Sequence, residues 1–191
     1  MNHVILIDCQ MYGLQSGLLS ITGSDKVKIE MAFMVGRMSL TNSSKEQIPC
    51  QSGNVLVELL RKKSWGKAAG LQALYNLSGL DDNATILVDA GMLPALTDIL
   101  FESQDAELNE LAAATIANIV SNPGHWELAS ADKKGHSMQF EPIVSSLLCL
   151  LSVVSPPCQV SVLCILCGIA SSPQAAGNFS SITSSSTVSN A

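Results

Sequence analysis

Residues 83 to 100 constrain the fold more than any other part of the chain, and they read NATILVDAGMLPALTDIL. Asp81 or Asp82 can cap the helix that begins there, because an aspartate side chain accepts the unpaired N–H groups of a first turn. Gly91 can end that helix, since glycine adopts the left-handed backbone conformation without strain. Pro94 suits the first turn of a second helix, where its missing N–H costs nothing. The stretch therefore predicts two helices joined by a sharp turn.

The same order of helices recurs along the chain. Downstream, Asp105 can cap a longer helix with the sequence AELNELAAATIANIVS. Upstream, we expect a helix that ends at Gly53, then a middle helix NVLVELLRK and a long helix GKAAGLQALYNLSGL. A third copy is readable in FEPIVSSLLCLLSVVSPP and CQVSVLCILCGIASS, and VKIEMAFMVGRMSL supplies a further long helix. Asn76 and Asn118 occupy matching points of two long helices, 42 residues apart, and Gly168 occupies that point in a third.

Repeats of about 40 residues, each built from two or three helices, are typical of the armadillo/HEAT class. One repeat cannot bury its apolar face alone, so stacked repeats form the core and leave an elongated, curved surface. We therefore predict an all-α fold, a right-handed α-solenoid of about three to four repeats. The repeats should occupy residues 26–173, with a loop insert at 122–138. Residues 1–25 do not match the pattern and residues 174–191 are rich in serine, so both ends are expected to be poorly ordered.

Four segments together resemble the C-terminal armadillo region of plant U-box E3 ubiquitin ligases, of the U-box domain-containing protein 43/44 type. They are VKIEMAFMVGRMSL, ILVDAGMLPALTDILF, ELAAATIANIVS and LLCLLSVVSPPCQVSVLCILCGIASSP, within residues 27–173. In that family a U-box docks the ubiquitin-charged E2 enzyme, and the armadillo array recruits substrates or regulators. Because this sequence contains no U-box-like segment, the resemblance implies a non-catalytic protein-binding module. The alternatives are a part of a ligase whose U-box is missing from this chain, or a truncated competitor.

The charge balance argues against nucleic acid and anionic lipid as partners. Acidic residues outnumber basic ones by 16 to 10, so the overall field repels phosphate groups. The apolar N-terminus lacks the basic region of a signal peptide, which predicts a cytoplasmic protein with reduced cysteines. Residues 142–172 carry no charge, but Pro156 and Pro157 divide them into halves shorter than the roughly 20 residues of a spanning helix. We expect a buried helical hairpin there, not a membrane segment.

The cysteines do not predict a metal site. Cys164 and Cys167 form a CxxC pair, but they lie within an apolar helix, and Cys149 and Cys158 make no second tight pair. Structural zinc sites use two such pairs on turns. Buried cysteine behaves as a small hydrophobic residue, so core packing is the preferred interpretation, with no metal and no cofactor.

The insert at 122–138 contains the residue types of a hydrolase, including His125 and His136, on a polar segment without a rigid frame. Catalysis needs a nucleophile, a base and an orienting acid held in hydrogen-bond geometry, so we predict no catalytic residues. Trp126 is the unusual residue of this insert. A large aromatic side chain in a loop either packs beneath the loop or anchors a partner, and the sequence leaves both open.

The long helices carry the clearest binding signal. Leu71, Leu74 and Leu77 should face the core, while Gln72 and Asn76, four residues apart, share a neighbouring face. The matching pair in the next repeat is Ala114 and Asn118.

Peptide-binding armadillo arrays such as importin-α use an asparagine at this point to hold the peptide backbone, with a tryptophan four residues earlier. Both asparagines are present here, and both tryptophans are replaced. We therefore predict that Gln72, Asn76, Ala114 and Asn118 line a concave groove for an extended peptide of a substrate or regulator of ubiquitination. Such a groove would not be specialised for basic nuclear-import peptides. Asparagine also forms simple hydrogen bonds between helices, and that alternative stays open.

Overall fold

The computed structural model describes residues 24–63, 65–121 and 137–171, and every regular element in these ranges is helical. The predicted N-terminal segment (up to residue 23), most of the predicted insert and the serine-rich tail lie outside the described residues. The elements are α2 (Asp25–Arg37), α3 (Asn42–Leu60), α4 (Trp65–Ser78), the 3-10 turn η1 (Asp81–Asn83), α5 (Ala84–Asp89), α6 (Met92–Glu102), α7 (Ala106–Val120), α9 (Glu141–Leu150) and α10 (Pro156–Ala170).

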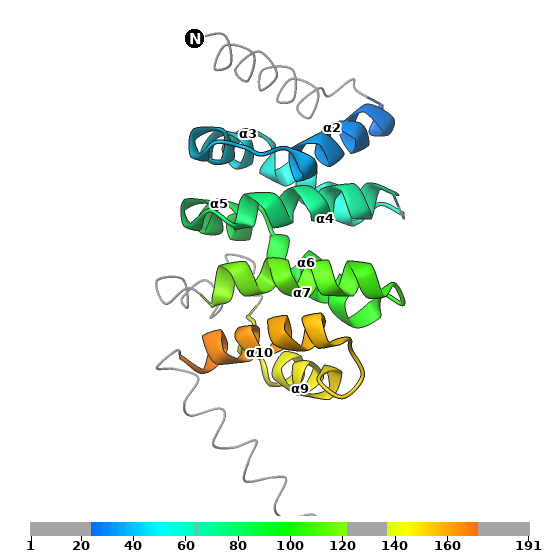
Figure 1. The fold of residues 1–191 in the computed structure, drawn as a ribbon, viewed down its shortest axis with the longest axis vertical. Coiled ribbons are helices and arrows are strands. Elements are labelled where there is room, and N and C mark those ends of the chain that lie inside the picture. The colour runs from blue at the N-terminus through cyan, green and yellow to red at the C-terminus, as the bar shows by residue number, and fades with distance from the viewer. Residues whose placement is uncertain (1–23, 64, 122–136, 172–191) are drawn as a thin grey trace, which may run out of the picture.

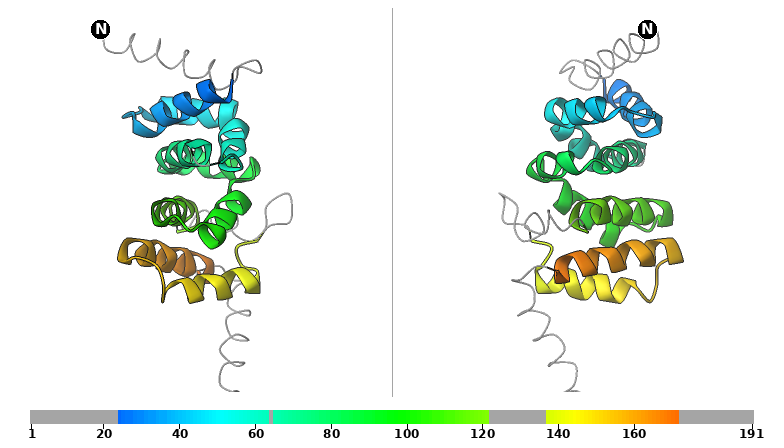
Figure 2. Two further views of the ribbon diagram at one scale, coloured as in Figure 1. Left: turned by 90° about the vertical axis from the view of Figure 1, so that its right-hand side faces the viewer. Right: turned by 60° about the vertical axis from the view of Figure 1, so that its left-hand side comes forward.

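The helices form two layers along an elongated stack (Figures 1 and 2). One layer contains α2, α4, α7 and α10, and each of these helices contacts the next in chain order. The second layer contains α3, α5, α6 and α9, which pack behind the first. This arrangement confirms the predicted all-α solenoid.

The turn at Gly91 is present as predicted. Gly91 has φ 87° and ψ 32°, the left-handed conformation, and its N–H donates to the Val88 carbonyl at 2.9 Å. The helical segments on its two sides, Asp81–Asp89 and Met92–Glu102, are bent by 85°. Among the described residues, no helix alone has the length and apolar composition to cross a membrane, and only this bent pair meets both criteria together.

Of the three residues predicted to cap helices, Asp105 does so and the other two do not. Asp105 caps α7 as expected, since its Oδ1 accepts the N–H groups of Glu107 at 3.0 Å and Leu108 at 3.3 Å. Neither Asp81 nor Asp82 caps α5, so that prediction was wrong. Both belong to the η1 turn, which carries the chain into α5 without a side-chain cap and leaves Asn83 buried.

The predicted break at Gly53 is also wrong, because α3 continues through Pro49 and Gly53 to Leu60. Gly91 is the described glycine with a positive φ, whereas Gly53 stays helical. Pro49 has no N–H to donate to the carbonyl of Lys45, one turn earlier. Asn83 of the next repeat donates to that carbonyl instead, from Nδ2 at 3.0 Å. A hydrogen bond between repeats therefore compensates for the proline.

The core runs along the contact between the two layers. Leu71, Leu74 and Leu77 are fully buried in it, as the spacing predicted. The α9–α10 pair is less buried than expected. Val162 and Ile165 face the core, but Leu148, Val153 and Val160 are exposed, so the predicted buried hairpin is buried on one side alone. A helix that is apolar on all sides does not reveal which side faces the core.

Candidate protein-interaction face on the long helices

The four predicted groove residues lie on the two central long helices. Gln72 and Asn76 are one turn apart on α4, and Ala114 and Asn118 are one turn apart on α7. All four are half-buried, and α4 and α7 pack side by side in the same layer (Figure 1). The fold therefore brings the two pairs onto neighbouring helices.

Both asparagines bind the end of the preceding long helix through their amide nitrogen. Asn76 Nδ2 donates to the carbonyl oxygens of Val35 at 2.7 Å and Met38 at 3.0 Å, at the end of α2. Asn118 Nδ2 donates to Ser78 Oγ at 3.0 Å, at the end of α4. The helix-to-helix role that the sequence left open is thus present. Among the described residues the Oδ1 atom of each asparagine has no hydrogen-bond partner, and neither atom is among the buried unpaired ones. Each side chain therefore keeps one acceptor for a ligand.

The third matching position, Gly168 on α10, brings two backbones together. A Cβ atom added at Gly168 would lie 2.1 Å from the carbonyl oxygen of Val120, at the end of α7. A similar contact joins α2 to α4, because a Cβ atom at Gly36 would lie 2.4 Å from Gln72 Cγ. Gln72 therefore also packs between repeats. The face formed by the long helices thus includes a residue that holds neighbouring repeats together.

An exposed aromatic cluster lies at the start of α4. The Trp65 side chain is 74% exposed, and its ring meets the Phe33 ring edge to face, with centroids 6.3 Å apart and planes at 77°. The Arg37 guanidinium lies 5.1 Å from the centroid of Phe33. Two aromatic rings and a cation thus hold one another at a surface position.

The cluster borders an open hollow with a cavity volume of about 990 Å³. This Trp65 hollow lies between α2, α4 and the start of α7, and Ala68, four residues before Gln72, lines it. The full lining is Phe33, Arg37, Trp65, Lys67, Ala68, Ser103, Gln104, Asp105, Glu107 and Leu108. The hollow therefore adjoins the α4 face that carries Gln72 and Asn76.

Trp65 was missed by the sequence reasoning, which looked for tryptophan one turn before each asparagine. Trp65 lies eleven residues before Asn76, which is three helical turns, so it falls on the same side of α4. Trp65 is seven residues, or two helical turns, before Gln72, so a search for aromatic residues seven positions earlier on this face would have found it. Trp126, the tryptophan that was singled out, lies outside the described residues, as do His125 and His136.

The cysteines of α9 and α10 face solvent more than predicted. Cys158 is buried, and its burial, with a smaller effect of the Glu110 carboxylate, raises the pKa of its thiol. Cys149, Cys164 and Cys167 are exposed, so core packing was the wrong interpretation for these three. The described residues include no group of three or more His, Cys, Asp or Glu side chains placed to hold a metal ion.

The exposed side of α10 forms a second, apolar hollow of about 310 Å³. Val160 is 61% exposed and Leu163 is 49% exposed, and both line this hollow together with Cys164 and Cys167. Gly168, which matches the two asparagines, also lines it. The long-helix face therefore becomes apolar at its C-terminal end.

Comparison with known proteins identifies the class. Residues 81–121 match the family described as Armadillo/beta-catenin-like repeat. A solved engineered protein superimposes with a TM-score of 0.69 at 24% identity, over 85% of this chain and 65% of that one. A designed armadillo repeat protein gives 0.66 at 21% identity, over 83% and 63%. Another, solved in complex with the peptide (KR)4, gives 0.64 at 19% identity over the same shares. These matches show that the chain has an armadillo-type α-solenoid fold.

Its sequence relatives are plant U-box proteins, as the resemblance implied. U-box domain-containing protein 43 of Arabidopsis thaliana is 31% identical over 163 residues, which are 83% of this chain and 20% of that protein. U-box domain-containing protein 44 of the same plant is 32% identical over 170 residues, 85% of this chain and 20% of that protein. The chain is homologous to these two proteins over one fifth of their length, and no U-box match was found within it.

Proposed function

We propose that this chain is a non-catalytic protein-interaction module that holds an extended segment of a partner across α4 and α7. One observation carries the proposal: Asn76 and Asn118 stand at matching points of adjacent helices, and each keeps an amide oxygen without a partner among the described residues. Neighbouring helices pack about 8–10 Å apart, which an extended chain spans in about three residues. Two backbone N–H groups of one segment can therefore donate to the two oxygens, with Gln72 and Ala114 beside them.

The partner class follows from the homology. In a U-box ligase the armadillo array recruits a substrate or a regulator, and we assign the same role and a cytoplasmic location to this chain. That a designed armadillo repeat protein was solved with a bound peptide supports the use of this fold as a peptide receptor.

Substitutions at the two asparagines should separate binding from stability. A peptide is first selected from a displayed random library, and its dissociation constant is measured by fluorescence anisotropy. Replacing both Asn76 and Asn118 by alanine should weaken binding about tenfold or more, because two hydrogen bonds of about 1 kcal/mol each are lost. Replacing both by aspartate keeps the oxygen acceptors but removes the Nδ2 donors that bind α2 and α4. The aspartate variant should melt at a lower temperature and still bind the peptide.

Arg61→Ala is the control, since Arg61 is exposed at the end of α3, and it should change neither property. Equal loss of binding in the aspartate and alanine variants, both folded by circular dichroism, would show that the oxygens are not the peptide acceptors. Normal binding by the alanine variant would assign the asparagines to repeat packing alone.

The chain by itself should not form polyubiquitin. Ligation requires a surface that docks the charged E2 enzyme, and the family match in this chain is an armadillo repeat at residues 81–121, without a U-box match. The purified chain is mixed with E1, E2, ubiquitin and ATP, next to a reaction that contains an active U-box ligase. Chain formation that depends on this protein would contradict its assignment as a non-catalytic module.

A further inference from the structure

We propose that the Trp65 hollow selects the partner, by binding a large apolar side chain that has an acidic residue on one side and a basic residue on the other. This inference rests on the proposed function, because the same extended segment continues from Asn76 of α4 into the hollow. It adds a specificity site at Trp65, Lys67 and Glu107, and it defines the side-chain chemistry of the occupant.

The apolar anchor is Trp65. An indole that is 74% exposed loses favourable burial unless something covers it, and here its orientation is set by the edge-to-face contact with Phe33. The Phe33 ring is in turn held in place by Arg37, whose guanidinium lies over that ring, 5.1 Å from the ring centroid. An aromatic residue that is already oriented loses little side-chain freedom on binding, which is the property of interface anchor residues. A hollow of about 990 Å³ has room for a leucine or an aromatic side chain of a partner.

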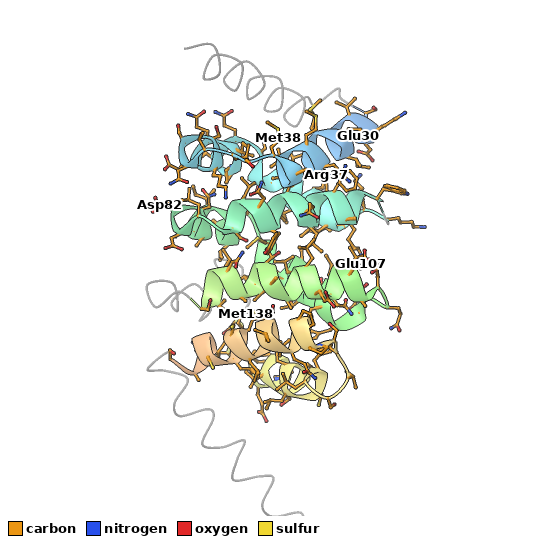
Figure 3. All side chains as sticks on the ribbon, viewed as in Figure 1. Glu30, Arg37, Met38, Asp82, Glu107 and Met138 are labelled. Atoms are coloured by element: carbon orange, nitrogen blue, oxygen red, sulfur yellow. The ribbon has the colours of Figure 1, made fainter. Side chains whose placement is uncertain are left out.

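The walls of the hollow carry opposite charges. Arg37 from α2 and Lys67 from α4 form the basic wall, and Asp105 and Glu107 at the start of α7 form the acidic wall. Figure 3 shows Arg37 between α2 and α4, and Glu107 in the first turn of α7, at the right-hand end of that helix in this view. Within the described ranges, the recorded salt bridges involve Lys62 with Asp25 and Glu58, and none joins these two walls.

Two of the four charges are available to a ligand. Arg37 already lies over the Phe33 ring, and Asp105 Oδ1 accepts two backbone N–H groups of α7. Lys67 and Glu107 have no side-chain partner among the described residues. A uniformly basic peptide would meet repulsion at Lys67, and a uniformly acidic one would meet it at Glu107. A segment with one charge of each sign complements both walls, which is how charged interfaces discriminate between partners.

Four synthetic peptides test the charge pattern. They share length and a central leucine, and their flanks read acidic–basic, basic–acidic, all acidic or all basic. One mixed order should bind at least about tenfold more tightly than either uniform peptide, measured by isothermal titration calorimetry at low and physiological salt. Trp65→Ala should weaken that peptide about tenfold and lower the melting temperature only slightly, because the exposed indole contributes to the fold mainly through its contact with Phe33.

The charge swap is the decisive variant. Lys67→Glu combined with Glu107→Lys exchanges the two walls and should reverse which mixed order binds more tightly. Lys67→Gln with Glu107→Gln is the matched control, and it should abolish the preference between the two orders. Far-UV circular dichroism and melting temperature confirm that each variant is folded.

The outcomes separate this inference from the proposed function. Equal binding of all four peptides, normal binding by Trp65→Ala, or an unreversed order in the swapped variant would overturn the inference. If a library-selected peptide still responds to the asparagine substitutions in that case, the proposed function stands without the specificity site. If neither the library nor the four peptides yield binding, both are overturned.

Discussion

Replacement of Gly168 by alanine is expected to lower the free energy of unfolding by about 3 kcal/mol, the upper part of the range for an overpacked site. The added Cβ would lie 2.1 Å from the Val120 carbonyl oxygen and 2.7 Å from the carbonyl carbon. Both are backbone atoms at the end of α7, so no flexible side chain can move aside. Helix α10 must shift away from α7, which weakens the contact between the last repeat and the rest of the stack. Urea denaturation followed by circular dichroism measures the change.

Gly53→Ala is the matched control, since it also replaces a buried helical glycine. Its nearest neighbour would be Ala90 Cβ at 3.8 Å, an ordinary contact, so alanine should stabilise the chain by about 0.4–1 kcal/mol. Hydrogen exchange adds a local measure, because the Gly168 variant should lose protection first in α9 and α10. Equal stability of the two variants would show that α7 and α10 do not approach as closely as described.

Replacement of Asn83 by alanine is the second substitution with a large expected effect. Asn83 is fully buried, and its Nδ2 donates to the carbonyls of Lys45 at 3.0 Å and Leu77 at 2.8 Å. The Leu77 carbonyl keeps another donor, the N–H of Leu80, but Pro49 cannot supply one to Lys45. The loss of both bonds, with the half-buried Lys45 carbonyl left without that donor, should cost about 2–4 kcal/mol.

A double-mutant cycle with Pro49→Ala tests the cause. Alanine at position 49 restores an N–H that can donate to the Lys45 carbonyl within α3, so Asn83→Ala should cost less in that background by about 1 kcal/mol or more. The free energies of unfolding of the four proteins give this coupling. Additive effects would mean that Asn83 does not compensate for the proline.

The architecture could be predicted from the sequence because its signals are local. A glycine followed three residues later by proline marks the turn at Gly91, and Asp105 lies directly before an apolar helix. Gly53 shows the limit of such signals. It has no following proline, and α3 instead carries a proline before the glycine, at Pro49, where Asn83 of the next repeat supplies a donor to the Lys45 carbonyl.

The candidate site was less predictable because it depends on contacts between repeats. The spacing correctly placed Asn76 and Asn118 on adjacent helices, but not the donation of their amide nitrogens to α2 and α4. Cys164 and Cys167 were expected in the core, since α10 is apolar on every side and periodicity cannot assign its buried face. Trp65 became visible as an anchor through its position beside Phe33 and the start of α7.

Binding of a partner to the face formed by the long helices can be observed directly by nuclear magnetic resonance. The ¹⁵N-labelled chain is titrated with the library-selected peptide. The chain has two tryptophans, so the indole signal of Trp65 can be assigned with a single substitution at Trp126. Binding on this face should shift the side-chain amide signals of Asn76 and Asn118, the Trp65 indole signal and signals along α4 and α7, with α3, α6 and α9 unchanged. Shifts confined to α3, α6 and α9, with the Asn76, Asn118 and Trp65 signals unmoved, would contradict it.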